Sequence, residues 1–146
     1  MEYQFTDKIQ PQQMGLVSDF LNSLKSDDVE LFWESLSRED KAYVYGSFRA
    51  LHTNGFEDLS IEDWKKQSFK RIKVQYKEYI GEYGVASIVR YYNKLLGDLY
   101  LQKDVKDNIT DTAETEKMGI KLPIVLQTCL TADDEIVGEW KLALFE

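Results

Sequence analysis

The first part of the chain has hydrophobic positions at helical spacing. Between residues 11 and 25 the apolar side chains recur every three or four positions and form one helical stripe. Pro11 suits the first turn of this helix, where its missing N–H is not needed. Asp27 or Asp28 can then cap a short second helix. The apolar residues of the two expected helices are Met14, Val17, Phe20, Leu21, Leu24, Val29, Phe32, Trp33 and Leu36.

Two further helices are expected to begin at serine caps. Ser37 is followed three residues later by Asp40, a start signal close to a capping box. This third helix should end near Gly55, because glycine accepts the left-handed conformation that closes a helix. Ser60 repeats the start signal, and we expect the fourth helix to end near Phe69.

Beyond the fourth helix the hydrophobic period changes to two, which is typical of strands. Residues 72–76 alternate apolar and polar side chains, and residues 85–92 form a run of strand-forming residues after the turn GEYG. We expect strands in both segments and a third strand at residues 99–105. Residues 104–120 are polar and without period, which predicts a long surface loop, and their acids lack calcium-loop spacing.

The C-terminal segment LPIVLQTCLTADDEIVGEWKLALFE predicts two long neighbouring strands around an acidic turn. Its even-numbered positions are mostly apolar, so the even face should meet the helices and the mixed odd face should meet water or a partner subunit. The even-numbered apolar residues of the two strands share one face only if the loop between the strands has an odd number of residues, such as 133–135, or if a bulge lies near Gly138. A two-residue turn at Asp133-Asp134 would separate Trp140 from the leucines of the first strand, which are Leu122, Leu126 and Leu130.

The order of elements, helices first and then an antiparallel meander, predicts an α+β fold. We expect three to four N-terminal helices packed on a curved, mainly antiparallel sheet, in a single domain that covers residues 1–146. A chain of 146 residues is long enough to form its own core.

This order, the hairpin sequence RIKVQYKEYIGEYGVASIVRYYN and the last strand GEWKLALFE resemble the nuclear transport factor 2-like superfamily. In its SnoaL-like members an alanine-centred strand often follows a glycine turn, as in GEYGVAS, and the last strand often carries an element like Trp140-Lys141-Leu142. The resemblance implies a cone-shaped α+β barrel with an apolar pocket at its open end. Members use this cavity for isomerase, dehydratase, hydrolase or cyclase chemistry, or only to bind a ligand or a protein, so the fold does not assign the function.

The net charge of −8 argues against nonspecific nucleic-acid binding, which requires an excess of Lys and Arg. The single cysteine excludes an intramolecular disulfide, and the N-terminus lacks the pattern of a signal peptide. No apolar run approaches the roughly 20 residues that span a bilayer. We therefore expect a soluble, cytoplasmic protein that binds neither nucleic acid nor membrane.

Candidate catalytic groups are few. Most acids are at expected helix starts or turns, where capping explains them. His52 is the only histidine, which makes a zinc site improbable, and Cys129 lies in an apolar strand, where thiols are usually inert. The sequence contains no phosphate loop or nucleophile elbow. It therefore indicates no catalytic residue, no metal site and no cofactor.

Arg90 is the most informative charged residue because it interrupts a strand that is apolar on both faces. Its side chain must reach solvent, pair with an acid or meet a ligand. Tyr92 shares its face and Tyr45 on the third helix could oppose it, while Trp140 either fills the core or leaves a pocket beside Arg90. These four residues form the candidate ligand-binding set, beside the alternative that they serve packing alone.

Three functions are compatible with these observations. The first is binding of a small apolar or anionic molecule in an apolar pocket between helices and sheet. The second is a noncatalytic acidic interaction module, either a homodimer through the sheet or an inhibitor or immunity-type partner of a basic protein. The third is a cofactor-free isomerase, dehydratase or cyclase. A deep enclosed pocket would favour the first, and a filled core with an exposed apolar sheet face would favour the second.

Overall fold

The computed structural model describes residues 2–103 and 119–145 and has the expected α+β architecture. Its helices are α1 (Pro11–Ser26), α2 (Val29–Ser35), α3 (Arg38–Thr53), α4 (Ile61–Gln75) and the 3-10 turn η1 (Lys77–Tyr79). Its strands are β1 (Phe5–Lys8), β2 (Tyr83–Val85), β3 (Ile88–Asn93), β4 (Leu96–Lys103), β5 (Ile120–Leu130) and β6 (Ile136–Leu142). The strands form one antiparallel sheet in the order β1-β3-β4-β5-β6, and β2 also pairs with β4.

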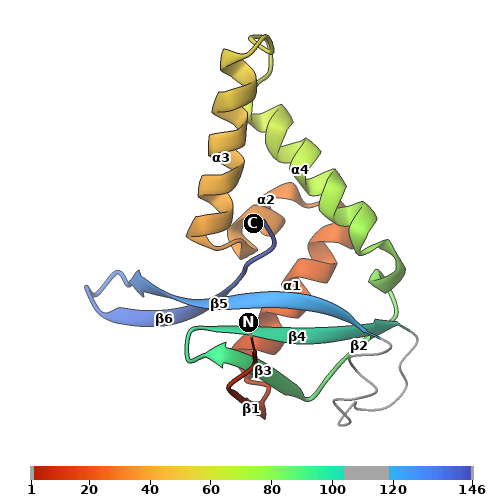
Figure 1. The fold of residues 1–146 in the computed structure, drawn as a ribbon, viewed down its shortest axis with the longest axis vertical. Coiled ribbons are helices and arrows are strands. Elements are labelled where there is room, and N and C mark those ends of the chain that lie inside the picture. The colour runs from red at the N-terminus through yellow and green to blue at the C-terminus, as the bar shows by residue number, and fades with distance from the viewer. Residues whose placement is uncertain (1, 104–118, 146) are drawn as a thin grey trace.

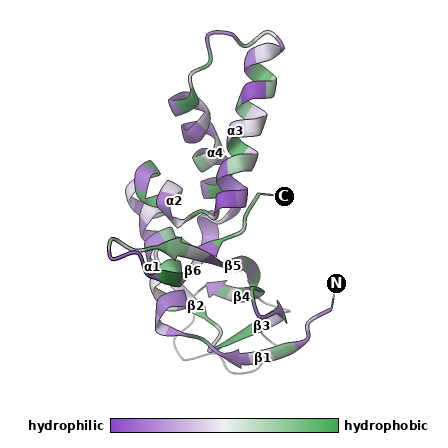
Figure 2. Ribbon diagram, turned by 90° about the vertical axis from the view of Figure 1, so that its left-hand side faces the viewer, coloured by the Kyte–Doolittle hydropathy of each residue, from purple (hydrophilic) through white to green (hydrophobic). Residues whose placement is uncertain are grey.

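Figure 1 shows two parts of the molecule. The sheet with α1 and α2 forms one part, which we call the body, and α3 and α4 form a helical hairpin that rises away from the sheet, which we call the arm. In the side view of Figure 2 the outer part of the arm stands apart from the sheet. Among the described residues, no helix has both the length and the apolar character needed to cross a membrane.

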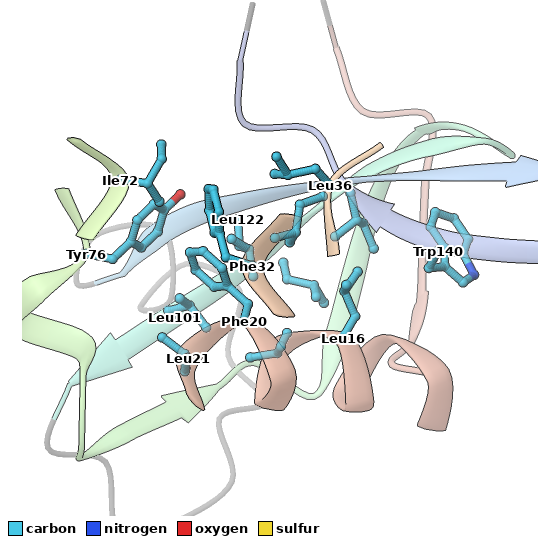
Figure 3. Packing of buried hydrophobic residues seen from close by; sticks show 14 of the residues in the cluster. Leu16, Phe20, Leu21, Phe32, Leu36, Ile72, Tyr76, Leu101, Leu122 and Trp140 are labelled. Atoms are coloured by element: carbon cyan, nitrogen blue, oxygen red, sulfur yellow. The ribbon is translucent and has the colours of Figure 1, made fainter. Parts of the chain in front are cut away.

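The hydrophobic core lies between α1, α2, the C-terminal end of α4 and one face of the sheet (Figure 3). Phe20 of α1 is at its centre and contacts Phe32 of α2 and Tyr76 at the end of α4, with ring centroids 6.4 and 5.1 Å apart. Trp140 lies at one end of the cluster and Tyr76 at the other. Side chains thus fill the space between the helices and the sheet.

The helix starts agree with the sequence prediction. Ser37 and Ser60 accept the backbone N–H groups of Asp40 and Asp63, and Asp28, rather than Asp27, caps α2. Pro11 occupies the first turn of α1. Local capping chemistry therefore determines where these helices begin.

The strand predicted at residues 72–76 is wrong, because α4 continues to Gln75. Phe69, Ile72 and Tyr76 recur at helical spacing and are buried in the core, whereas Val74 is 67% exposed. The alternation of apolar and polar residues at 72–76 is compatible with the period of a helix as well as with that of a strand. Contact of the helical stripe with the core stabilises the helix over the strand.

Other strands differ from the prediction in their boundaries. The expected strand at 85–92 is divided into β2 and β3, which both pair with β4, and the strand expected at 99–105 begins earlier, at Leu96. β1 was not predicted, because all four of its residues are exposed and show no burial pattern. The surface loop predicted at 104–120 lies largely outside the described residues, and its last residue, Ile120, already belongs to β5.

The odd loop length predicted for the C-terminal hairpin is confirmed, although the loop is two residues longer than 133–135. Leu126 pairs with Trp140 and Leu130 pairs with Ile136, so the connecting loop holds five residues, 131 to 135, an odd number. The two-residue turn is therefore excluded, and Trp140 shares a face with the leucines. This even face meets the helices only in part, because Leu130 and Ile136, at the far end of the hairpin, are 67% and 76% exposed.

Candidate protein-binding surface

Arg90 and Tyr92 lie together on β3, on the sheet face opposite the core residues Val89 and Tyr91. Tyr3 from the N-terminal segment covers both side chains. Its ring stacks on Tyr92 at a centroid distance of 4.7 Å, and the Arg90 guanidinium lies 4.5 Å from the Tyr3 ring centroid. The predicted neighbourhood of Arg90 and Tyr92 is thus present, and the N-terminal segment occupies it.

A buried carboxylate completes this cluster. Asp98 of β4 pairs with Arg90 in the sheet and accepts hydrogen bonds of 2.7 Å from the hydroxyls of both Tyr3 and Tyr92. The Tyr3 hydroxyl also lies 2.7 Å from that of Tyr100. Burial, together with the bonds to Asp98, raises the pKa of Tyr3 and of Tyr92. The hydrogen bond from Tyr3 to Asp98 and the stacking of Tyr3 on Tyr92 hold the N-terminal segment on the sheet.

The other two candidate residues lie elsewhere. Tyr45 is on the arm, where its ring meets Trp33 edge to face at 5.5 Å. Trp140 is on the core face of the sheet, opposite Arg90, and is only 6% exposed. Trp140 therefore fills the core, and the structure does not bring the four residues into one pocket.

Cys129, the single cysteine of the chain, is hydrogen-bonded to a carboxylate. The Cys129 thiol donates a hydrogen bond of 3.0 Å to Glu139, which raises the pKa of the thiol and lowers the pKa of the carboxyl. A thiol in this state is a poor nucleophile at neutral pH. Within the described residues, no group of three or more His, Cys, Asp or Glu side chains is placed to hold a metal ion.

The described surface has several open hollows. The largest, of about 710 Å³, lies beside the part of β5 that β6 does not cover. There the Tyr76 hydroxyl donates to the Lys121 carbonyl at 3.1 Å, and the Pro123 carbonyl accepts the N–H of Ala143 at 2.9 Å. The residues that line this hollow include Tyr3, Tyr76, Tyr100, Lys121 and Leu144.

Two smaller hollows meet at Trp140. One, of about 360 Å³, lies between α1, α2 and β6 and is lined by three carboxylates, Asp19, Glu34 and Glu139, against the single ammonium of Lys141. The other, of about 380 Å³, has a mixed lining, in which Phe5, Tyr91, Leu126 and Trp140 lie beside polar and charged residues and Gly138. Gln12 and Trp140 belong to both hollows.

The end of the β5–β6 hairpin exposes apolar side chains on the same two strands. Leu130 and Ile136 form a pair on the even face, beyond the helices. Val137 adds a partly exposed apolar side chain on the other face. We call this region the Trp140 surface; it comprises Gln12, Asp19, Glu34, Leu126, Leu130, Ile136, Gly138, Glu139 and Trp140.

Sequence reasoning selected Trp140 but missed its neighbours. Gln12, Asp19 and Glu34 are polar residues on helix surfaces, and nothing in their local sequence separates them from other solvated positions. The exposed pair Leu130 and Ile136 carried a usable signal, since they are the even-face residues nearest the turn and thus farthest from the expected helices. Comparison of the chain with known protein families, with curated proteins and with solved structures found no match, so the resemblance to the nuclear transport factor 2-like superfamily stays a prediction.

Proposed function

We propose that this chain is a noncatalytic protein-binding module that binds a basic partner protein at the Trp140 surface. The observation that carries the proposal is the exposed apolar end of an edge hairpin, where Leu130 and Ile136 are 67% and 76% exposed. Large apolar side chains at the open edge of a sheet favour association, and proteins usually cover or charge such edges. A filled core beneath this edge supports binding on the surface rather than in an enclosed pocket.

The charge of the surface indicates the chemistry of the partner. Three acidic residues, Asp19, Glu34 and Glu139, line the hollow beside Trp140 with Lys141, which pairs with Glu139 at 3.6 Å, and the whole chain has a net charge of −8. Opposite charge on a partner would accelerate association and select against acidic proteins. We therefore infer that the partner presents Lys or Arg side chains beside apolar ones.

A second copy of this chain fits the surface less well. Antiparallel pairing of two β6 strands about Val137 would place Glu135 of the second copy beside Glu139 of the first. Like charges directly opposite each other destabilise strand pairing. The acidic turn 133–135 thus disfavours self-association through this edge.

The proposal is tested by capture from the native cell with matched variants. Ile136→Asp places a charge in the apolar end of the surface, whereas Val74→Asp makes the same change at a position that is 67% exposed on α4. We expect the wild-type chain and Val74→Asp to retain a protein, identified by mass spectrometry, whose isoelectric point is above about 9. Ile136→Asp should lose it, and the affinity of the purified pair should fall with added salt.

Several outcomes would overturn the proposal. Recovery of no basic protein, or equal loss with both variants, contradicts binding at this surface. A wild-type dimer in analytical ultracentrifugation that Ile136→Asp dissociates would assign the surface to a second copy instead.

A second candidate function is small-molecule binding in the hollow beside β5. Its volume of about 710 Å³ is in the usual range for ligand sites. Lys121 offers a cation, and Tyr3 and Tyr100 offer aromatic rings, which together suit an aromatic anion. A thermal-shift screen of aromatic carboxylates should then show stabilisation that Lys121→Ala weakens, and the absence of any shift would exclude this candidate.

A further inference from the structure

The backbone of β6 alternates between groups that face β5 and groups that face outward. The N–H of Trp140 donates to the side chain of Gln12 at 3.1 Å, and the carbonyl of Leu142 accepts from the N–H of Ser37 at 2.9 Å. On the partner strand, the N–H of Leu126, which is opposite Trp140, donates to Leu95 on the far side from β6. Even-numbered residues of β6 therefore direct their N–H and C=O groups away from β5.

By the same alternation, Ile136 and Gly138 present outward backbone groups. In the described part of the chain, no hydrogen bond reaches the N–H or C=O of either residue. Gln12 and Ser37 cap the edge only from Trp140 onward. The open edge is thus short, and it coincides with the exposed apolar end of the hairpin.

We propose that the partner binds by strand addition, with an extended segment pairing along β6 at residues 136–138. This inference rests on the proposed function and deepens it, since it names the form of the partner. An extended segment supplies the donors and acceptors that an open edge lacks, and its alternate side chains then meet the two sides of the sheet. A helix or a globular face would leave the outward groups of Ile136 and Gly138 unpaired when buried.

The ends of the open edge determine the side chains of the segment. Pairing cannot continue past Gly138, because Gln12 already occupies the N–H of Trp140. The segment must leave the sheet there, beside the hollow lined by Asp19, Glu34 and Glu139. We infer a segment with aliphatic residues next to Ile136 and Gly138 and a Lys or Arg at the end that lies nearest the carboxylates.

Gly138 keeps the hollow beside Leu126 and Trp140 open for this segment. A Cβ atom at this position would lie 3.0 Å from Cδ1 of Leu126, which is closer than ordinary contact. Gly138 lines the hollow beside Leu126 and Trp140. A larger side chain would occupy the space that an aliphatic side chain of the segment needs.

Selection from a random peptide library displayed on phage, with the full chain immobilised, provides the probe. We expect enriched peptides to alternate aliphatic residues and to carry Lys or Arg at one end. A synthetic enriched peptide should slow amide hydrogen exchange at Ile136 and Gly138, by about a hundredfold at a peptide concentration of about 100 times Kd. The amides of Val137 and Glu139, which face β5, serve as internal controls and should change little.

A pair of glycine variants tests the hollow. Gly138→Val should weaken binding of the peptide at least about tenfold, the loss expected for one filled apolar contact. Gly46→Ala is the control, because nothing lies within 4 Å of an added Cβ there. Unchanged exchange at core amides of the variant would show that the fold is intact, and unchanged affinity of an intact Gly138→Val would contradict the proposal.

The remaining outcomes separate this inference from the proposed function. Enriched peptides that bind without protecting Ile136 and Gly138 would overturn strand addition. No enriched peptide, together with capture of a basic protein that depends on Ile136, would show that the partner uses a folded surface, so the proposed function would stand alone. Enrichment of acidic peptides would contradict both.

Discussion

The body and the arm differ in how their side chains are buried. In the body, α1 buries seven of its 16 residues against the sheet, including Val17, Phe20 and Leu24, which are fully buried. In the arm, α3 has the same length of 16 residues but buries only two, Asp40 and Val44. Helices of equal length thus depend on tertiary packing to very different degrees.

Few contacts join α3 to the body, whereas the C-terminal end of α4 packs in the core through Phe69 and Ile72. At the base, the carboxylate of Asp40 accepts the backbone N–H groups of Leu144 and Phe145 at 2.7 and 2.9 Å. Farther along, the Lys65 ammonium lies 4.4 Å from the Trp33 ring centroid. Segments with few buried contacts open without global unfolding, so α3 should exchange its amides faster than α1. The body, which carries the Trp140 surface, is the rigid part.

The largest expected difference in stability comes from the same Phe→Ala substitution made in the body and in the arm. Phe20→Ala should lower the free energy of unfolding by about 3–5 kcal/mol, because it leaves a cavity at the centre of the core. Phe48→Ala makes the same change on α3, where the ring is only partly buried and contacts His52, and should cost about 1 kcal/mol. Urea unfolding of both variants measures the difference. Similar losses would show that the arm is as tightly packed as the body.

An intermediate loss of stability is expected at the junction between α3 and the body. Asp40→Asn replaces one carboxylate acceptor by an amide donor, so one of the N–H groups of Leu144 and Phe145 loses its partner. The expected loss is about 2 kcal/mol. Hydrogen exchange should accelerate in α3 more than in α1. The control is Glu39→Gln, an exposed neighbour in the same helical turn, and an equal effect there would assign the loss to charge alone.

The smallest effect is expected from alkaline pH, and it concerns the body. The pKa of Tyr3 is raised in the folded state, first by burial and then by its hydrogen bonds to Tyr100 and Asp98. An unfolded tyrosine ionises near about pH 10, so the contribution of Tyr3 is complete below that pH and is lost as pH rises above it. Urea unfolding from neutral pH to above about pH 10 should therefore show a smaller decline for Tyr3→Phe than for the wild type. Parallel curves would contradict a raised pKa at Tyr3.

Much of the fold followed from signals within a few residues. Serine caps at Ser37 and Ser60, and the parity of the C-terminal hairpin, predicted elements that the structure contains. The end of α4 could not be predicted this way, because residues 72–76 suit both periods and their contact with Phe20 lies far away in sequence. β1 has no apolar face at all, so only its pairing with β3 defines it.

The candidate surface was less accessible to prediction. Trp140 was selected because an aromatic residue on an apolar strand must face either a core or a ligand, and it faces the core. Arg90 and Tyr92 were placed together correctly, but their partners Tyr3 and Asp98 were not foreseen, because Tyr3 is distant in sequence and Asp98 belongs to another strand. The sequence around a polar residue does not reveal which distant residues contact it in the folded protein.

By itself, the sequence determined the helix caps, the hydrophobic stripes, the antiparallel hairpin and the net charge, since each depends on composition or on residues within a turn of one another. Only the tertiary structure decided that β6 is an edge strand, that Gln12 in the first turn of α1 binds the N–H of Trp140, and that three acidic residues gather beside Trp140. Which strand lies at an edge depends on the pairing of all the strands. The exposure of Ile136 is therefore a property of the whole fold rather than of its own segment.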